Sequence, residues 1–545
     1  MTVPLGPLGK KTYQQAVVLW RDLSPAGREI ARKRAATDRL LDQLARSSDQ
    51  RFQGTVLVDG MWDNPNYWLR YSFLRAALGL AHGREVGLTG QFRRRQVSTT
   101  FSALGIRDLI SFPDVAVSSA ISEQAIRLVS ETNNAADVLA WKLPGDVHPT
   151  IVYDGILKQQ RRATLDVKRA DFLPLVIEAL TAITRAQATL DQAKPNLVVI
   201  SHPLNFTYGS LAWLALSRGI PVVLPFGLFG VLRFTRFTQP EDLFAFYDRP
   251  TRAEIDDLQS TQADALASIG RQYLAGRMAG RADDLASVFA FRNRSGDIDR
   301  SQLCAANGWD PARPIVAFYA SNWFDWPHQL GMTQFRDFLD WTEATFAAAK
   351  ANGGVNWLFK PHPAEDWFGG VALSDILVQL GAPSNIAIAG KQWNNAAVMQ
   401  SVDAMVTYHG TAGVEFAALG KPVLVPDRGK YDDCGFVRVA KNRADYLSLL
   451  GREWWDEMDL AETKRKADIF AGWWFCAPEW QGGFVLSDDA KQDALYDLIP
   501  DLIGRNSSTV EREIKSVQDW WHSGHRYYHT SKMREADAFR LTNIG

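Results

Sequence analysis

Cysteine is scarce in this chain. Three of its 545 residues are cysteines, and they lie far apart, at Cys304, Cys434 and Cys476. This spacing supports neither a disulfide framework nor a metal cluster built from cysteines. We therefore expect the protein to work in a reducing compartment.

Long apolar runs are also missing. No stretch approaches about 18 uninterrupted apolar residues, the length at which a membrane-spanning helix becomes a candidate. The first residues, MTVPLGPLGKKTYQQ, lack the apolar core of a secretion signal. These two observations lead us to expect a cytoplasmic protein.

Neither sign of charge is in excess, because 60 Lys and Arg residues stand against 61 Asp and Glu residues. A dedicated nucleic-acid binder normally has a basic balance, so no nucleic-acid partner is expected. Residues 10–50 are a local exception, with Arg and Lys between apolar positions at helical spacing. Such a helix either docks on its own domain or lies on an anionic membrane. Peripheral association with the inner face of the cytoplasmic membrane, or with an assembly complex, therefore stays open.

Tryptophan, in contrast, is abundant, with 19 residues that gather toward the C-terminal end of the chain. Aromatic side chains at this density suit either helix packing or a surface that stacks on sugars or lies at a membrane. We expect helix packing. The residues concerned are Trp454, Trp455, Trp473, Trp474, Trp480, Trp520 and Trp521.

The length of the chain exceeds what one hydrophobic core usually organises, so two large domains are expected. Strand-like apolar segments alternate with helical stretches, which predicts an α/β fold of two Rossmann-like, doubly wound parallel sheets facing a central cleft. The expected strands are 54–60, 85–88, 110–112, 150–153, 197–200 and 220–224, then 315–319, 355–360, 386–389, 404–408 and 423–425. The expected parts are an N-terminal helical segment (1–53), a first domain (54–305) with a helical insertion (228–305), a second domain (306–508) and C-terminal helices that brace the first domain (509–545).

The segment from Asp403 to Asp427 carries the clearest functional signal. It predicts a buried strand followed at once by His409, Gly410 and Thr411, which open a helix. Backbone N–H groups at such a turn favour an anion, most often a phosphate. Earlier in the chain Lys360-Pro361-His362-Pro363 ends another strand, so two strand ends aim basic or N–H-rich groups at one crevice. A nucleotide site is expected there.

Each candidate residue in this second half could also have a purely structural role. Glu415, one turn into the helix, is placed to accept bonds from ribose hydroxyls, or else only complements the helix dipole. His362 and His409 suit a phosphate, or else are histidines held by the backbone. Metal ligands are not evident, and no metal or other cofactor is expected.

The first half also offers side chains that could do chemistry. Asp154 is the first choice, because it follows the expected strand 150–153 and would lie at the carboxyl edge. It would act as a general base or as a nucleophile, or else it merely caps a helix. Asp59 and Asp63 are weaker alternatives, and His202 is a further candidate in this half.

These motifs resemble the GT-B glycosyltransferases. The residues that carry the resemblance are Lys360-Pro361-His362-Pro363, His409-Gly410-Thr411-Ala412-Gly413 with Glu415, and Ala418-Leu419-Gly420-Lys421-Pro422. More narrowly the chain is similar to bacterial surface-polysaccharide enzymes, namely capsule Kdo transferases, polysialyltransferases and CDP-glycerol glycerophosphotransferases. In the first half Tyr153-Asp154, Ser201-His202, Tyr208-Gly209 and Gly219-Ile220-Pro221 match the Kdo transferase pattern. The family's Gly-Asp pair is displaced here to Gly145-Asp146, and Lys158 stands where an Arg is usual.

The resemblance implies a metal-independent transferase that uses a nucleotide sugar, CMP-Kdo by preference, and a surface polysaccharide or glycolipid acceptor. In this reading the donor nucleotide is bound by Lys360, His362, Pro363, His409, Gly410, Thr411 and Glu415, while Asp154 and His362 act in catalysis. Asp154 would deprotonate an acceptor hydroxyl or attack the anomeric carbon. The possible acceptor-side residues are Asp59, Asp63 and His202. Other donors (CMP-sialic acid, CDP-glycerol or a UDP-sugar) remain alternatives. So do a nucleotide-sugar 2-epimerase and a non-catalytic carbohydrate-binding partner.

Overall fold

The computed structural model describes residues 24–529 with gaps at 92–93, 117–119, 227–231, 247–248, 250, 262, 283–286, 293–295, 364, 476–495, 497–498, 501–502 and 505–506. Parts of both terminal segments, and Trp480, therefore lie outside the described residues.

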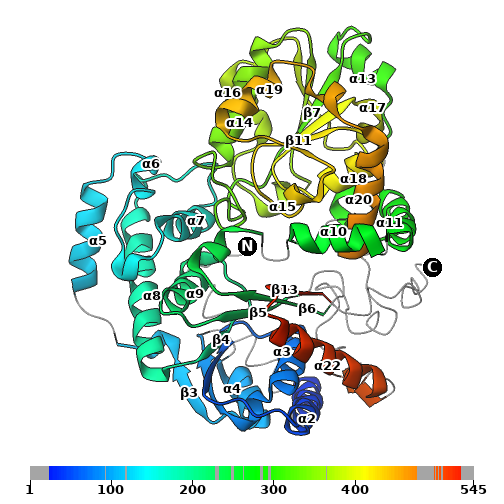
Figure 1. The fold of residues 1–545 in the computed structure, drawn as a ribbon. Helices are drawn as coiled ribbons and strands as arrows, with labels where there is room; N and C mark the ends of the chain where they lie inside the picture. Colours follow the sequence, from blue (N-terminus) through cyan, green and yellow to red (C-terminus); the bar gives the residue numbers. More distant parts are fainter. Residues whose placement is uncertain are drawn as a thin grey trace.

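Two sheets with helices on their faces make up the two halves of the molecule (Figure 1). The first sheet has the strand order β13-β6-β5-β4-β1-β2-β3. The run from β5 to β3 is parallel, whereas β6 pairs antiparallel with β5 and β13 antiparallel with β6. Its strands are β1 (Thr55–Gly60), β2 (Arg84–Thr89), β3 (Asp108–Ser111), β4 (Leu197–Val199), β5 (Val222–Phe226), β6 (Arg233–Phe237) and β13 (Tyr527–His529).

The second sheet is parallel throughout, in the order β12-β11-β10-β7-β8-β9. Both sheets thus place their own first strand between their second and fourth strands, which is the Rossmann arrangement. The α/β doubly wound class expected from the sequence is confirmed. The strands are β7 (Ile315–Tyr319), β8 (Asn356–Lys360), β9 (Ile386–Ile388), β10 (Ala404–Thr407), β11 (Val423–Val425) and β12 (Arg438–Val439).

Helices cover both sheets. Those of the first half are α2 (Pro25–Arg46), α3 (Pro65–Leu78), α4 (Arg94–Ala103), α5 (Ala120–Ser130), α6 (Ala135–Val138), α7 (Pro149–Gln160), α8 (Phe172–Ala193), α9 (Asn205–Ser217) and α22 (Ser507–Ser523). Those around the second sheet are α10 (Arg252–Thr261), α11 (Ala263–Met278), α13 (Arg300–Asn307), α14 (Phe338–Ala351), α15 (Glu365–Phe368), α16 (Leu373–Leu380), α17 (Asn395–Ser401), α18 (Ala412–Ala418), α19 (Arg443–Leu450) and α20 (Leu460–Phe475).

The strand expected at 150–153 is wrong, because these residues lie in the first turns of α7. The side chain of His148 caps this helix and Pro149 stands at its first position, both of which favour helix over strand. Nearly the whole of α7 is buried, so its apolar run Ile151–Tyr153 has no polar face that would have marked it as helical. Asp154 therefore lies inside a helix and not at a strand end.

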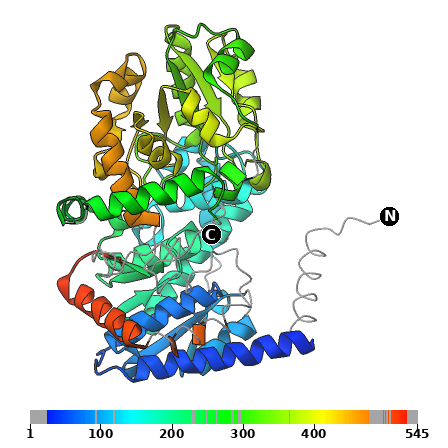
Figure 2. The ribbon, with the colours of Figure 1, turned by 90° about the vertical axis from the view of Figure 1, so that its right-hand side faces the viewer.

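The helical insertion packs on the second half of the molecule. Helices α10 and α11 lie against α20, where Figure 2 shows the green α11 meeting the orange α20. Gly270 of α11 and Gly472 of α20 permit this close crossing, since a Cβ on either would sit about 2 Å from a backbone oxygen of the other helix. The insertion was expected with the first half, and the contact with α20 shows that it bridges to the second.

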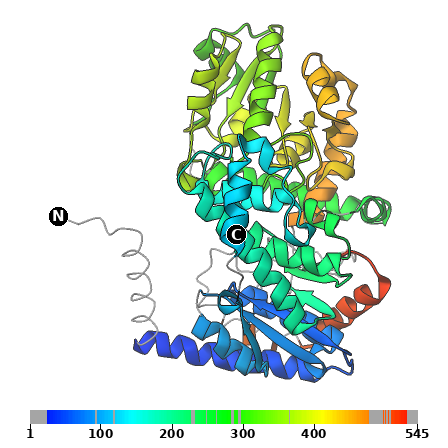
Figure 3. The ribbon, with the colours of Figure 1, turned by 90° about the vertical axis from the view of Figure 1, so that its left-hand side faces the viewer.

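The C-terminal part of the chain returns to the first half. Helix α22 packs against α3, and β13 extends the first sheet beside β6 (Figure 3). Trp454, Trp473, Trp474 and Trp520 are all buried, so these four pack in the interior as expected. Within the described part of the chain, no helix is both long and apolar enough to cross a bilayer.

The Gly472→Ala variant should unfold more easily. Its new methyl group would lie 2.1 Å from the carbonyl oxygen of Leu266, and overpacking of this kind costs about 1–3 kcal/mol. Gly276→Ala in α11 is the matched control. Its Cβ meets no atom within 4 Å, so it should be neutral or stabilise by up to about 1 kcal/mol. Denaturant unfolding of both variants measures the difference, and equal stabilities would contradict a close crossing of α11 and α20.

Candidate active site

The carboxyl edge of the second sheet brings the two expected donor motifs together. Strands β8 and β10 flank β7, and the register aligns Tyr319 with both Lys360 and Thr407. His362 and His409 each follow two residues after these aligned positions. They therefore lie at the same edge, beside the position between β7 and β10 where a Rossmann-type sheet binds its ligand.

His409 is the most unusual group at this edge. Its side chain is buried, and its Nδ1 has no hydrogen-bond partner among the described residues. Burial, and after it the positive charge of Lys430, lowers the pKa of His409 to about 3. His409 is thus a neutral imidazole with one unsatisfied nitrogen. Buried polar atoms are rarely left unpaired, and a ligand is one way to satisfy this one.

The turn after His409 is held in place by a residue that lies later in the chain, Tyr431. Gly410 accepts a hydrogen bond on its carbonyl oxygen from the hydroxyl of Tyr431, at 2.7 Å, and Thr411 is the N-cap residue of α18. Gly413 lies so close to Tyr431 that a Cβ would be 2.2 Å from the tyrosine oxygen. The start of α18 is therefore fixed by the segment that follows β11.

Two other residues expected to bind the donor nucleotide, Glu415 and Lys360, interact with other side chains of the protein. Glu415 is buried and forms an ion pair with Arg277 of α11, with 2.6 Å between carboxylate oxygen and Nε. Lys360 is also buried, with its ammonium 5.6 Å from the ring centre of Tyr319. A ribose contact for Glu415 stays a prediction, and it would have to share the carboxylate with Arg277. Pro363 lies in the loop after β8, beside His362.

In the first sheet Asp59 joins the ends of β1 and β4. One carboxylate oxygen accepts from the N–H of Met61, and the other accepts from both the N–H and the hydroxyl of Ser201. Burial raises the pKa of Asp59 to about 6, although these hydrogen bonds oppose the shift. Asp59 thus holds the two strand ends together at the position where this sheet would bind a ligand.

His202 and Trp62 form an aromatic wall next to Asp59. The His202 ring lies 4.2 Å from the ring of Tyr208 and edge-on to Trp62 at 5.6 Å. Burial lowers the pKa of His202 to about 4, so its imidazole is neutral near pH 7. Trp62 is 40% exposed, in contrast to the buried tryptophans described above. No sequence pattern had marked Trp62 as a site residue.

Asp63, the other acceptor-side carboxylate, is committed to a structural role. Arg34 of α2 donates to both of its oxygens, at 2.6 and 2.8 Å, and the indole N–H of Trp68 donates to one of them. The whole group is buried. Asp63 therefore fixes the loop after β1 and is not placed to take a proton from an acceptor.

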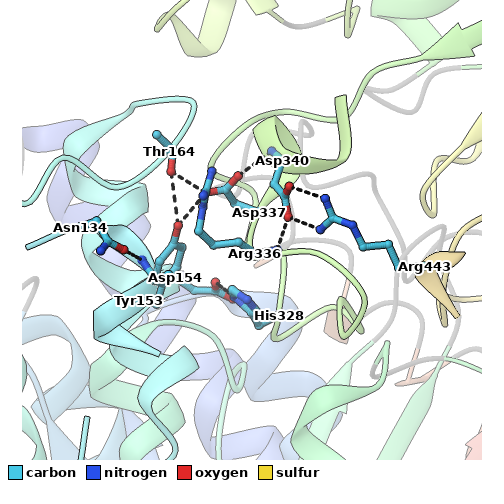
Figure 4. Close-up of polar contacts among 10 residues, drawn as sticks. Asn134, Tyr153, Asp154, Thr164, His328, Arg336, Asp337, Asp340 and Arg443 are labelled. Atoms are coloured by element: carbon cyan, nitrogen blue, oxygen red, sulfur yellow. Dashed lines mark hydrogen bonds and ion pairs between the residues drawn. The ribbon is translucent and has the colours of Figure 1, made fainter. Parts of the chain in front are cut away.

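Asp154 connects the two halves. Its Oδ1 lies 2.7 Å from Nδ1 of His328, and its Oδ2 accepts the backbone N–H of Gln329 at 2.9 Å (Figure 4). The Gln329 side chain in turn donates to the carbonyl of Pro203 and accepts from the N–H of Asn205. His328 and Gln329 belong to the segment between β7 and α14, so one first-half carboxylate positions a second-half histidine. Sequence reasoning missed both residues.

A second buried carboxylate also forms hydrogen bonds between the two halves. Asp337 caps α14 and accepts hydrogen bonds from Tyr153 and Thr164 of the first half and from Arg336 beside it (Figure 4). Burial is the largest cause that raises the pKa of Tyr153. We call the segment 321–337, together with its first-half partners, the junction.

No metal site accompanies these groups in the described ranges, where no cluster of three or more His, Cys, Asp or Glu side chains could hold an ion.

No protein-family model and no curated protein matches this chain. Solved structures with a similar fold include the β-Kdo 2,4 transferase KpsC of Thermosulfurimonas dismutans, at 17% identity and a TM-score of 0.30 over 50% of this chain and 78% of that one. The UDP-GlcNAc 2-epimerase of Neisseria meningitidis matches at 12% identity and a TM-score of 0.24 over 84% and 100%. The glycosyltransferase SnogD of Streptomyces nogalater matches at 14% and 0.22 over 77% and 94%. The matched structures are thus glycosyltransferases and a nucleotide-sugar epimerase, and at these identities and TM-scores they assign this chain neither a family nor an activity.

The His202→Gln variant should lose less stability in acid than the parent. The half-buried imidazole of His202 has a pKa of about 4, against about 6.5 in the unfolded chain. Between these two pH values only the unfolded state takes up the proton. The contribution of His202 to the free energy of unfolding is therefore fully present above pH 6.5 and is lost as the pH falls toward 4. Removing His202 should reduce the slope of unfolding free energy against pH by up to about 1.4 kcal/mol per unit.

Denaturant unfolding at several pH values measures this slope. His82→Gln, at an exposed histidine, is the control and should leave the slope unchanged. An unchanged slope in His202→Gln would contradict the lowered pKa of His202 in the folded state.

Proposed function

We propose that this chain is a glycosyltransferase that moves a sugar from a nucleotide-activated donor to a saccharide or glycolipid acceptor. The observation that carries the proposal is the Asp154–His328 pair, which joins a first-half carboxylate to a second-half histidine. On the second half, His362 and His409 follow the ends of β8 and β10, on either side of β7, and suit a phosphate. On the first half, Trp62 and His202 offer an aromatic surface that suits a sugar ring.

In the proposed mechanism the second half holds the donor and stabilises the departing phosphate. His409 offers an unsatisfied nitrogen, Lys430 brings a positive charge close to it, and His362 lies at the same edge. Preorganised donors and charges of this kind stabilise a leaving phosphate in a site that excludes water. This supports transfer without a metal ion.

The junction supplies the group that takes the acceptor proton. Asp154 accepts the Nδ1–H of His328, which leaves Nε2 of the imidazole as the basic nitrogen. A carboxylate in this position orients the imidazole and stabilises the imidazolium that forms when Nε2 takes a proton from the acceptor hydroxyl. Asp154 is then a positioning residue. Direct attack by Asp154 on the anomeric carbon is the alternative, and it would require His328 and Gln329 to release the carboxylate first.

For the substrates we propose CMP-Kdo as donor and a growing surface polysaccharide or glycolipid as acceptor, at the inner face of the cytoplasmic membrane. The support for this choice is the set of motifs around His362, His409 and Asp154. CMP-sialic acid, CDP-glycerol and UDP-sugars are the other donors to be compared.

The test is incubation of the full chain with a panel of these nucleotide donors, with and without saccharide acceptors, followed by chromatography of nucleotide and sugar. Acceptor-dependent release of free nucleotide, undiminished by EDTA, supports the proposal. Epimerised nucleotide sugar would identify a 2-epimerase instead, and no turnover of any donor would support a non-catalytic binding protein. Activity that EDTA abolishes and magnesium or manganese restores would overturn the metal-free mechanism.

Asp154→Asn should abolish turnover while nucleotide binding survives. The amide keeps the size of the side chain but cannot stabilise an imidazolium at His328, and a comparable change in a Ser-His-Asp triad lowers kcat about 10⁴-fold. The measurements are kcat and calorimetric binding of the nucleotide, which Asp154 does not contact in this proposal.

Asp337→Asn is the control, since Asp337 is an equally buried carboxylate of the junction with no part in the proton transfer. It should lower stability and retain most of kcat. Equal losses of kcat in both variants would assign Asp154 a purely structural role.

A further inference from the structure

A groove of about 960 Å³ lies on the first half, between α2 and α4. It is far from the junction, at the end of the molecule opposite the second sheet (Figure 1). A volume of this order is typical of ligand-binding pockets and exceeds what one small ion needs. The lining residues are Ala35, Arg39, Arg94, Arg95, Ser98, Thr99, Ser102 and Ala103.

The lining is strongly basic. It contains three arginines and no acidic side chain. Arg94 forms an exposed ion pair with Asp114. Arg39 and Arg95 are exposed and form no ion pair with any described residue. Two guanidinium groups therefore face a shared groove without a carboxylate from the protein to neutralise them.

The other lining side chains are small, and several carry hydroxyl groups. Ser98, Thr99 and Ser102 add hydrogen-bonding oxygens on α4, and no aromatic or large apolar side chain lines the groove. An apolar ligand or a stacked base would gain little here. Guanidinium forks together with hydroxyl groups suit an anion whose oxygens point in several directions, as those of a phosphate do.

A buried network of hydrogen bonds holds the two walls of the groove, α2 and α4, against each other. Arg34 of α2 donates to the hydroxyl of Thr100 of α4 at 2.8 Å and pairs with Asp63, while Thr100 donates to Asp38 at 2.8 Å. All four side chains are buried. This network fixes α2 against α4, so the groove is preformed and a ligand need not order it.

We propose that this groove binds a phosphate-bearing ligand through Arg39 and Arg95. The site is independent of the junction and of the reaction proposed there. The phosphate could belong to a phospholipid headgroup or to a soluble phosphorylated compound, and the experiment separates these two sources.

The test compares the full chain with the Arg39→Gln/Arg95→Gln double variant. Arg107→Gln/Arg127→Gln is the matched control, because it removes the same charge from exposed arginines of the same half outside the groove. One arm measures co-sedimentation with phosphatidylcholine vesicles that contain phosphatidylglycerol, and with vesicles of phosphatidylcholine alone. The other arm measures calorimetric binding of inorganic pyrophosphate. Unfolding curves of all three proteins check that the variants are folded.

We expect the double variant to bind about 30-fold more weakly in one of the two arms, while the control stays within a few-fold of the parent. A loss confined to phosphatidylglycerol vesicles identifies the lipid headgroup, and a loss confined to pyrophosphate identifies a soluble ligand. Equal binding by the double variant and the control would overturn the proposal, as would a parent protein that binds neither probe.

Discussion

The arrangement of the two halves depends on buried carboxylates at the junction, first of all Asp154 and beside it Asp337. Asp154 is fully buried, and a charge in that position is costly unless hydrogen bonds compensate it. Its compensation comes from His328 and Gln329 of the other half. Separating the halves would leave Asp154 without these donors. The docked state is therefore favoured by the chemistry of one side chain as well as by apolar contact.

The segment that meets Asp154 is fixed at its other end too. Asp427, which follows β11, accepts hydrogen bonds from the backbone of Thr333 and Gln334 and from the hydroxyl of Tyr408. Tyr408 directly precedes His409, so the strand that carries the expected phosphate site also holds the junction segment. Trp326 has a φ of 54°, a conformation that costs a non-glycine residue about 1–3 kcal/mol. Its neighbour Asp325 pairs with Lys158 of α7, and such contacts are needed to keep a strained segment in place.

The sequence was a good guide to what is local and a poor guide to contacts between distant residues. Buried apolar strands such as β8 and β10, each followed by polar or glycine-containing turns, predicted that His362 and His409 share one edge. The Asp154–His328 contact joins residues 174 positions apart, and the Arg277–Glu415 contact joins residues 138 apart, so no spacing pattern marks either. Helix α7 was mistaken for a strand because it is buried on nearly all sides. The role of Asp63 was missed for a related reason, since its partner Arg34 lies 29 positions earlier in the chain.

The proposed mechanism gives a reason for building the proton acceptor from both halves. His328 comes from the second half, which is proposed to hold the donor, and Asp154 from the first, which is proposed to face the acceptor. The imidazole is oriented for proton transfer only when the halves are docked. A base assembled in this way does not act on water when the halves are apart, which limits wasteful hydrolysis of the activated donor. The same contact that stabilises the docked state thus also decides when the proposed chemistry can occur.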